Sequence, residues 1–541
     1  MSPLLRCGGG NMNRPLEMAA APRDRIECVA AATGAPLGSV PVDDPASVRA
    51  AVSRARRAQH DFAHADFARR RRLLGRLSDR IVEEIDTICG WVVEDSGKTR
   101  EHALMGEVWP VLEKLRWTMR HGERHLAPER VSPGIFAHKT AYLRYEPLGV
   151  VGAIVPWNYP FQNLLGPIVT ALFAGNAIVL KPSEHVAFSS EKIAGLVREV
   201  LREAGEDPDL VQIVQGYAET GQALIAAGID GLLFIGSVQN GKKVLAAAAE
   251  QVIPVVLELG GKDPFIVCDD ADLEQAVHGA FAGCFISAGQ NCVAAERLLV
   301  HKDVYDRFVA RVAELASKLR QGPPGLERVV DVGAMTTPMQ REIVERLVAD
   351  AIAKGAQVVA GGEPVRSAGG NFVAPTVLAD VRPHMDIFRE EVFGPVMCIT
   401  KVVDDEDAVE LANATAYGLG ASVFSRDLER ARRIVRRLEA GMCAINDFGG
   451  LTYMAQDLTF GGVKASGFGR MNGRDGLRAM CRQKSVLDER VPLGIANKLF
   501  PVGPKDYQRI AAAVRMIYGR GLGARLRGAA RLVRGLGSSS S

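Results

Sequence analysis

The pattern of apolar and polar positions changes near residue 130. From Pro45 to about Arg130, apolar residues recur at helical spacing among charged ones, which predicts a run of helices. Beyond it, short apolar runs such as "VVGAIVP" and "GNAIVLKPS" alternate with helical segments such as "SEKIAGLVREVLREAG". This alternation is typical of a parallel sheet of the dinucleotide-binding kind, so the first part of the chain is predicted to be an α/β domain.

A second alternation of strands and helices begins after "VVLELGGK" and continues to about Asn446. It predicts helices near Asp303 to Arg320 and Pro338 to Lys354, followed by the strand "AQVVAGG". The 541 residues are also too many for one simple core. A second α/β domain is the simplest account.

The stretch from Asn158 to Leu180 has no charged residue and is the one candidate for a membrane span. Pro160, Pro167 and Gly175 interrupt it, so a buried helix followed by a strand fits better.

The first residues contain no apolar run suited to an export signal. The nine cysteines have neither a C-x-x-C pair nor a zinc-binding spacing, so no metal site is expected. These features favour a protein of the reducing cytoplasm.

The charge of the chain is balanced except near its end. A formal charge of +3 indicates no nucleic-acid partner, and the basic run from Arg69 to Arg72 is interpreted as the solvated face of a helix. After Lys505, seven arginines are accompanied by one acidic residue, Asp506. Their apolar neighbours predict an amphipathic surface that contacts an anionic membrane or, since glycines weaken the helix, a disordered tail.

Two segments after predicted strands carry residues suited to a dinucleotide. In "AIVLKPSEH", Lys181 and Glu184 are placed to hold ribose hydroxyls, with a surface salt bridge as the alternative. In "FIGSVQNGKKV", Gly236 and Gly241 allow a pyrophosphate to approach a helix N-terminus, with a plain tight turn as the alternative. The segment "EDSGKT" ends like a phosphate-binding loop, but Val92 stands where that loop needs a glycine. We therefore discard it.

Three more residues are candidates for chemistry. Glu258 in "VVLELGGK" has apolar neighbours, which would raise its pKa towards that of a general base, unless it only caps the next turn. Asn158 in "VPWNYP" is fixed by two prolines, as an oxyanion donor or as a turn residue. Cys292 in "ISAGQNCVAAERL" is, on this stretch alone, best interpreted as a small apolar residue.

Seven motifs together change that interpretation. They are "PWNYP", "KPSE", "FIGSVQNG", "LELGGK", "GQNC", "EEVFGP" and "FGGVKASGFGR". In this order and approximate spacing the chain resembles the aldehyde dehydrogenase superfamily over about residues 25 to 488. The segment "INDFGGLTYMAQDLTFGGVKASGFGR" is similar to a less-studied branch with plant and fungal members.

The resemblance implies an enzyme that oxidises an aldehyde to a carboxylic acid with NAD or NADP. Cys292 would attack the aldehyde as a thiolate, and the Asn158 side chain and the Cys292 backbone N–H would bind the oxyanion. Hydride transfer would leave a thioester, which water activated by Glu258 would hydrolyse.

The resemblance also implies where cofactor and substrate lie. Lys181 and Glu184 would take the adenosine ribose, and the Glu184 carboxylate favours NAD because it would repel a 2′-phosphate. The cofactor-binding residues are expected to be Pro156, Trp157, Lys181, Glu184, Gly236, Ser237, Gly241, Leu259, Glu391 and Phe393. The substrate pocket is expected to include Tyr159, Gly166, Asn291, Val293 and Phe460.

The chain departs from the family pattern at several positions. Ile235 stands where a threonine is common and Thr459 where a proline is usual, so the local loops are expected to differ in shape. Gly166 stands where many members carry a bulky aromatic, and Pro167 replaces a frequent lysine. We predict a wider tunnel suited to long or bulky aldehydes.

The resemblance implies an α/β fold with a dinucleotide-binding parallel-sheet domain, a second α/β catalytic domain and a small β oligomerisation arm. The expected ranges are an N-terminal extension (1–25), the dinucleotide-binding domain (26–135 and 150–258), oligomerisation strands (136–149 and 476–490), the catalytic domain (259–475) and a basic C-terminal tail (491–541). A homodimer or homotetramer is expected, with "TAYLRYEPLG" and "MCRQKSVLDER" pairing across subunits.

Two alternative functions are weighed against this one. A CoA-acylating dehydrogenase would pass the acyl group to CoA and would not need the water-activating Glu258. A catalytically silent membrane-surface or assembly module should have lost Cys292, Glu258 or Asn158, and all three are present.

Overall fold

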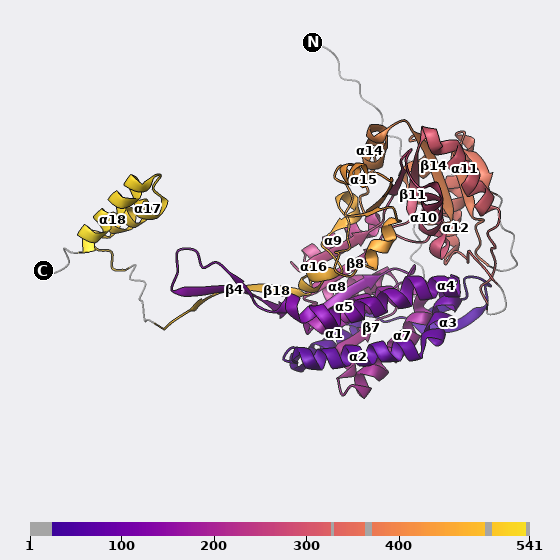
Figure 1. Ribbon diagram of the computed structural model, residues 1–541. Coiled ribbons are helices and arrows are strands. Elements are labelled where there is room, and N and C mark those ends of the chain that lie inside the picture. The colour runs from indigo at the N-terminus through magenta and orange to yellow at the C-terminus, as the bar shows by residue number, and fades with distance from the viewer. Residues whose placement is uncertain (1–23, 326–328, 363–369, 493–499, 537–541) are drawn as a thin grey trace, which may run out of the picture. The chain divides into compact units, whose positions relative to one another are not determined.

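The computed structural model describes residues 24–325, 329–362, 370–492 and 500–536 (Figure 1). The chain divides into two compact units, one of residues 1–129 with 143–485 and one of residues 130–142 with 486–541. The first unit contains two large, mostly parallel sheets, each packed against helices.

A six-stranded sheet in the first unit has the order β17-β9-β8-β5-β6-β7. Its strands are β5 (Val150–Val155), β6 (Ala177–Pro182), β7 (Val211–Ile213), β8 (Gly231–Gly236), β9 (Val255–Leu259) and β17 (Gly467–Phe468). All are parallel except β17, which pairs antiparallel with β9 and sets Gly467 opposite Glu258. Every residue of β6 is buried, as expected for a parallel strand covered on both faces.

The uncharged stretch forms the predicted helix and strand. Helix α6 (Pro160–Ala174) is buried along nearly its whole length, and β6 follows it. Helices α1 (Pro45–Phe62) and α8 (Ala218–Ala226) pack against β5 and β6, α7 (Ala187–Glu203) against β7, and α9 (Val238–Ala249) against β8 and β9. Among the described residues, no helix is long and apolar enough to span a bilayer.

The predicted helical run before residue 130 is confirmed. It comprises α1, α2 (Phe67–Glu83), α3 (Ile85–Ser96), α4 (Arg100–Ala103), the π-helix η1 (Leu104–Val108) and α5 (Trp109–Leu126). Asp44 and Asp66 cap α1 and α2 by accepting main-chain N–H bonds at 2.7 Å.

The basic run from Arg69 to Arg72 is not wholly solvated as predicted, because Arg70 is buried and donates to the Phe173 carbonyl at 3.0 Å. That carbonyl lies in the last turn of α6, where a cation is favoured.

A seven-stranded sheet in the first unit has the order β12-β13-β14-β11-β10-β15-β16. Its strands are β10 (Asp263–Val267), β11 (Ala295–His301), β12 (Gln357–Ala360), β13 (Thr376–Ala379), β14 (Val396–Val402), β15 (Gly420–Phe424) and β16 (Met442–Ile445). The helices of this region are α10 (Leu273–Phe285), α11 (Lys302–Ala316), α12 (Pro338–Ala353), α13 (Asp386–Arg389), α14 (Asp405–Asn413) and α15 (Leu428–Val435), whereas α16 (Gly473–Arg478) packs on α5 and α6. Both helices predicted here and the strand after them are present, with only edge strand β12 antiparallel.

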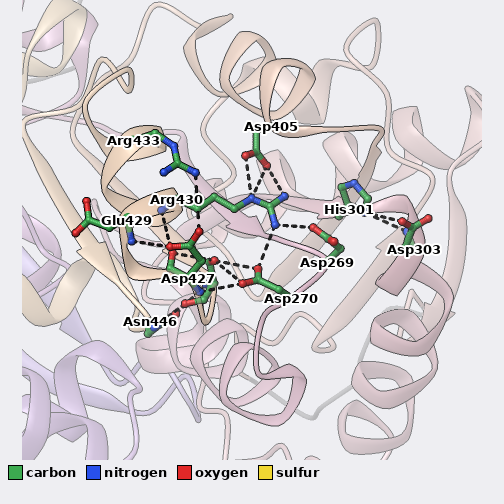
Figure 2. Close-up of polar contacts among 11 residues, drawn as sticks. Asp269, Asp270, His301, Asp303, Asp405, Asp427, Glu429, Arg430, Arg433 and Asn446 are labelled. Atoms are coloured by element: carbon green, nitrogen blue, oxygen red, sulfur yellow. Dashed lines mark hydrogen bonds and ion pairs between the residues drawn. The ribbon is translucent and has the colours of Figure 1, made fainter.

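An ion network braces the seven-stranded sheet (Figure 2). Arg430 of α15 pairs with Asp405 at 2.6 Å, Asp269 at 2.7 Å and Asp270 at 3.3 Å. The hydrogen bonds to these carboxylates, above all the one to Asp405, raise the pKa of Arg430 above its usual value. Asn446 lies just after β16. Its side chain accepts a hydrogen bond from the Ser425 N–H and donates one to the Ser425 carbonyl. The network thereby fixes the chain where it leaves β16.

The smaller β elements are a hairpin and a three-stranded sheet. Strands β1 (Arg25–Val29) and β2 (Pro36–Pro41) pair antiparallel. The three-stranded sheet has the order β18-β4-β3, from β18 (Cys481–Glu489), β4 (Lys139–Pro147) and β3 (Glu129–Val131). The segments "TAYLRYEPLG" and "MCRQKSVLDER" thus form neighbouring strands within one chain.

In its described part the C-terminal segment forms two helices. Helix α17 (Asp506–Tyr518) is followed by α18 (Leu522–Leu536), and the two pack on each other. A Cβ on Gly528 would lie 2.5 Å from the Met516 backbone nitrogen, so the glycine permits this close contact. Five short 3₁₀ turns complete the described chain, η2 (Glu184–Val186), η3 (Pro208–Leu210), η4 (Ile286–Gly289), η5 (Gly449–Tyr453) and η6 (Lys464–Ser466).

Candidate active site

A cavity of about 500 Å³ in the first unit brings together the residues predicted for chemistry and substrate. Its wall includes Cys292, Glu258 and Asn158, together with Tyr159, Gly166, Asn291, Val293 and Phe460. The cavity adjoins both sheets, since Glu258 lies in β9 of one sheet and Cys292 precedes β11 of the other. Within the described chain, Cys292 is the cysteine that lines this cavity.

The backbone before Cys292 is strained. Ser287 and Ala288 have φ of 52° and 55°, values that side-chain-bearing residues rarely adopt, and Gly289 follows at 70°. The Ser287 N–H donates to His102 Nδ1 at 3.1 Å. The Gln290 side chain donates to the Ser287 carbonyl at 3.0 Å and accepts from the Thr336 N–H at 2.8 Å. These bonds hold the cysteine in a fixed position.

The Cys292 thiol is surrounded by acidic groups. Burial, then the neighbouring Glu258 and Glu391 carboxyls, hold its pKa well above the usual range. The thiol is therefore neutral in the protein alone. Deprotonation requires a base nearby or a positive charge brought in by a ligand.

Glu258 has the environment of a proton acceptor. Its side chain is 2 % exposed, and Oε1 has no hydrogen-bond partner within the described residues. Burial raises the pKa of this carboxyl to about 7, although hydrogen bonding with Cys292 lowers it in part. Glu258 can therefore take up and release a proton near neutral pH.

The Asn158 amide is held at both ends. Its Nδ2 donates to the Gln290 carbonyl at 3.2 Å, and its Oδ1 accepts from Asn163 Nδ2 at 3.2 Å. An amide nitrogen carries two hydrogens, so one remains for another acceptor in the cavity. A donor fixed in this way suits an oxyanion.

A buried ion pair that the sequence analysis missed supports Asn158. Lys98, in the discarded "EDSGKT" segment, lies 2.6 Å from Glu107 Oε1 and donates to the Asn158 carbonyl at 2.7 Å. Glu107, in η1, accepts with Oε2 from the Phe161 N–H at 2.6 Å. The pair therefore holds the chain at the Asn158 carbonyl and again at Phe161, where α6 begins. No local motif signals it, because the contact depends on the turn between α3 and η1.

The residues predicted to bind a dinucleotide lie where the strand order reverses. From β5 the chain continues to β6 and β7 on one side and to β8 and β9 on the other. Trp157 follows β5, Lys181 lies near the end of β6 and Gly236 ends β8, all at carboxyl ends of parallel strands. This is where open α/β sheets bind nucleotides. Ser237 caps the 12-residue helix α9, whose N-terminus favours a pyrophosphate.

Two further contacts near these strand ends involve Lys181 and Gly241. Lys181 Nζ lies 3.5 Å from Glu184 Oε2. Burial alone would raise the pKa of Glu184, but the positive charge of Lys181 and hydrogen bonding bring it below the usual glutamate value. A Cβ on Gly241 would lie 2.6 Å from Leu259 Cδ2, so this glycine lets α9 pack closely on β9.

Glu391 and Phe393 are anchored near the same strand ends. Glu391 Oε1 accepts from the Gly261 N–H at 2.9 Å, and the Phe393 and Trp157 rings meet edge to face at 5.4 Å, with Pro156 immediately before Trp157. The Phe393 N–H donates to Glu296 at 2.9 Å, and Glu296 forms a buried ion pair with Lys262 at 2.6 Å. The donors, carboxylates and aromatic faces in this set are those that a dinucleotide needs.

Comparison with known proteins gives a consistent result. The sequence profile of the "Aldehyde dehydrogenase family" matches residues 18–486. An aldehyde dehydrogenase-like protein of Saccharomyces cerevisiae is 42 % identical over 86 % of this chain and 75 % of its own length. The 4,4'-diapolycopene aldehyde oxidase of Methylomonas sp is 39 % identical over 91 % of both chains. The NAD⁺ complex of an aldehyde dehydrogenase from Bacillus cereus superposes with a TM-score of 0.80, at 33 % identity over 86 % of this chain and 94 % of that one.

Proposed function

The chain belongs to the aldehyde dehydrogenase family and is an NAD(P)-dependent enzyme, and we propose that it oxidises an aldehyde to a carboxylic acid through a covalent intermediate on Cys292. One observation carries this proposal. The Cys292 thiol, the Glu258 carboxyl with its raised pKa and the fixed Asn158 amide line the same cavity.

The first step forms a bond between sulfur and carbon. Glu258 takes the thiol proton, and Cys292 Sγ attacks the aldehyde carbon while the carbonyl π electrons move to oxygen. The remaining amide hydrogen of Asn158 and the Cys292 N–H stabilise the resulting oxyanion. Because the donor is already fixed by Gln290, little reorganisation is needed at this step.

The cofactor, when bound, supplies the acceptor that takes a hydride from the substrate carbon. Lys181 and Glu184 would hold its adenosine ribose, Gly236 and Ser237 its pyrophosphate, and Glu391 its nicotinamide ribose. Phe393 would pack near the nicotinamide, with Pro156, Trp157, Gly241 and Leu259 forming the surrounding wall. We favour NAD, because the Glu184 carboxylate would repel a 2′-phosphate.

Hydrolysis completes the reaction. Glu258 first releases the thiol proton to solvent and then takes a proton from water, whose oxygen attacks the thioester carbon; the C–S bond breaks, which frees the carboxylic acid and returns Cys292 as the thiolate. Transfer of the acyl group to CoA would not need a base at this position, so the Glu258 environment favours hydrolysis.

The test is formation of reduced nicotinamide with short, long and aromatic aldehydes, using NAD and NADP in parallel. Cys292→Ala should abolish turnover, while the control Cys443→Ala, which does not line the cavity, should retain it. Glu258→Gln should release at most about one equivalent of reduced cofactor, formed slowly because Glu258 also takes the thiol proton, and then stall. Turnover of Glu258→Gln restored by CoA would identify the acylating enzyme, and no turnover of the wild type with any pair would favour the silent module.

We also propose that the chain is a homodimer or homotetramer that assembles through the three-stranded sheet. Strand β18 is an exposed edge, and Leu487 on it is 52 % exposed, so it offers unpaired backbone groups and an apolar side chain. Leu487→Glu should lower the mass in light scattering, whereas Leu428→Glu on α15 should not. A monomeric wild type would overturn this proposal.

We further propose that the enzyme works in the cytoplasm with its C-terminal helices at an anionic membrane surface. The eight cysteines of the described residues are all free, which supports a reducing compartment. The helices α17 and α18 carry arginines and expose apolar side chains such as Tyr507 and Leu522, which suits a basic amphipathic surface.

A further inference from the structure

A second polar group lies in the wall of the Cys292 cavity. Lys114 of α5 and Asn472, just before α16, both line it, and Lys114 Nζ donates to Asn472 Oδ1 at 2.5 Å. The two residues are 5 % and 3 % exposed. Their neighbours in the wall are mostly apolar, among them Pro110, Pro167, Met471, Ala479 and Met480.

Lys114 differs from the other buried lysines in having no acidic partner. Lys98 pairs with Glu107 at 2.6 Å, Lys262 with Glu296 at 2.6 Å, and Lys181 with Glu184 at 3.5 Å. Within the described residues, Lys114 forms no ion pair, and burial lowers its pKa to about 7. A buried ammonium without a counter-charge is costly, so the lysine is poised to accept an anion.

Asn472 adds a second donor to the site. Because its Oδ1 accepts from Lys114, its Nδ2 is left as a donor. This nitrogen meets no full hydrogen-bond geometry within the described chain, but it lies close enough to the Tyr453 hydroxyl in the same wall to offset part of the rise that burial causes in the pKa of that tyrosine. Asn472 is held at φ 59°, so the backbone also pays a conformational penalty to keep it in place. Two neighbouring buried side chains thus present donors to the cavity, and one of them, Lys114, lacks a counter-charge.

We propose that Lys114 and Asn472 bind a carboxylate of the substrate, so that the enzyme acts on aldehydes that carry a carboxylate remote from the reacting group. This inference rests on the oxidation proposed above and names its substrate class. A neutral carbonyl would satisfy the donors but leave the ammonium unpaired. A carboxylate supplies the counter-charge that Glu107 and Glu296 supply to Lys98 and Lys262.

The kinetic test compares ω-carboxy aldehydes with uncharged aldehydes of the same length. In the wild type, kcat/KM should favour the carboxy series at one chain length. Lys114→Met and Asn472→Asp should each lower the ratio of the two kcat/KM values about tenfold or more, because a charge-assisted hydrogen bond is lost. Asn472→Asp is nearly isosteric and gives Lys114 an internal counter-ion, so it tests the site even where Lys114→Met fails to fold. The exposed Lys318→Met is the matched control and should leave the ratio unchanged.

A binding test separates this inference from the oxidation itself. Calorimetry on the full-length protein would compare dicarboxylates from succinate to suberate with monocarboxylates of the same length. Tighter binding of one dicarboxylate, lost in Lys114→Met and Asn472→Asp, supports the site even where no aldehyde is oxidised. Equal binding of the two series by the wild type, or a preference that both variants retain, overturns it.

Discussion

Lys98 donates a 2.7 Å hydrogen bond to the main-chain carbonyl of Asn158. The lysine is itself fixed by Glu107, which also accepts N–H bonds from the start of α6. The segment that starts at Asn158 and leads into α6 is thus held at two points by one buried ion pair. Its position is determined by residues that do not touch the substrate oxygen.

Breaking this pair should cost stability and activity separately. Glu107→Gln leaves the Lys98 charge uncompensated and should lower the free energy of unfolding by roughly 3–5 kcal/mol. The double variant Lys98→Met with Glu107→Leu should recover much of that stability, because no buried charge remains. Its kcat should stay low, since the Asn158 carbonyl has lost its donor.

Urea unfolding and steady-state kinetics would measure both effects. The exposed pair Lys318–Glu314 is the matched control, and Lys318→Met should change neither quantity appreciably. Wild-type kcat in the double variant would show that Asn158 does not need this support.

Activity should rise with pH through about 7, the pKa to which burial raises Glu258. Water activation needs the carboxylate, so the rate of thioester hydrolysis follows the deprotonated fraction. The measurement is kcat across neutral pH with an aldehyde that makes hydrolysis rate-limiting. A profile that stays flat down to the usual glutamate pKa would exclude Glu258 as the base.

Stability should depend on pH in the opposite direction. The Glu258 pKa is 4.5 ordinarily and about 7 when buried in the folded protein, so between these values the unfolded chain releases a proton that the folded chain keeps. The wild type should therefore lose roughly 3 kcal/mol relative to Glu258→Gln as pH rises across this interval. Urea unfolding of both proteins at the two ends of the interval measures the difference. A difference independent of pH would mean that the folded pKa is not raised.

The sequence could predict the parts of the fold and site that depend on local pattern. The buried helix and strand of residues 158–180 followed from their lack of charge and from Pro160 and Gly175. Glu258 and Lys181 were found because each stands at the end of an apolar run, and carboxyl ends of parallel strands lie at one edge of a sheet.

Features that depend on distant contacts could not be predicted. Lys114 and Asn472 are 358 positions apart, and nothing near either residue indicates the other. Arg70 belongs to a basic run that is typical of a solvated face, yet the end of α6 takes its guanidinium into the core. The glycines after Gly519 argued against helices, but Gly528 lets α18 pack on Met516.

Gly166→Trp should narrow the cavity. A Cβ at this position would meet only the Tyr453 hydroxyl, at 3.6 Å, so the site is open where a large side chain could enter. The variant should lower kcat/KM for long or bulky aldehydes about tenfold relative to short ones. Gly90→Trp, also in a helix with open space around it and outside the cavity wall, is the control. An unchanged chain-length preference would show that Gly166 does not set the width of the tunnel.

The C-terminal helices should bind anionic vesicles. On α17 the side chains of Tyr507, Ile510 and Val514 are 79 %, 58 % and 49 % exposed at helical spacing, and on α18 those of Leu522 and Leu526 are 78 % and 62 % exposed. Arg515, Arg520, Arg525, Arg527 and Arg531 accompany them.

Because apolar insertion and basic charge both favour an anionic bilayer, the protein should sediment with phosphatidylserine vesicles. Salt should weaken this binding, and binding to vesicles of phosphatidylcholine alone should be weaker still. Leu522→Glu with Leu526→Glu should reduce binding about tenfold or more, because two leucine side chains that would enter the bilayer are lost. The same two changes at Leu428 and Leu458, which are exposed in the first unit, should not. Equal sedimentation of the wild type and the α18 variant would mean that these helices do not contact the lipid.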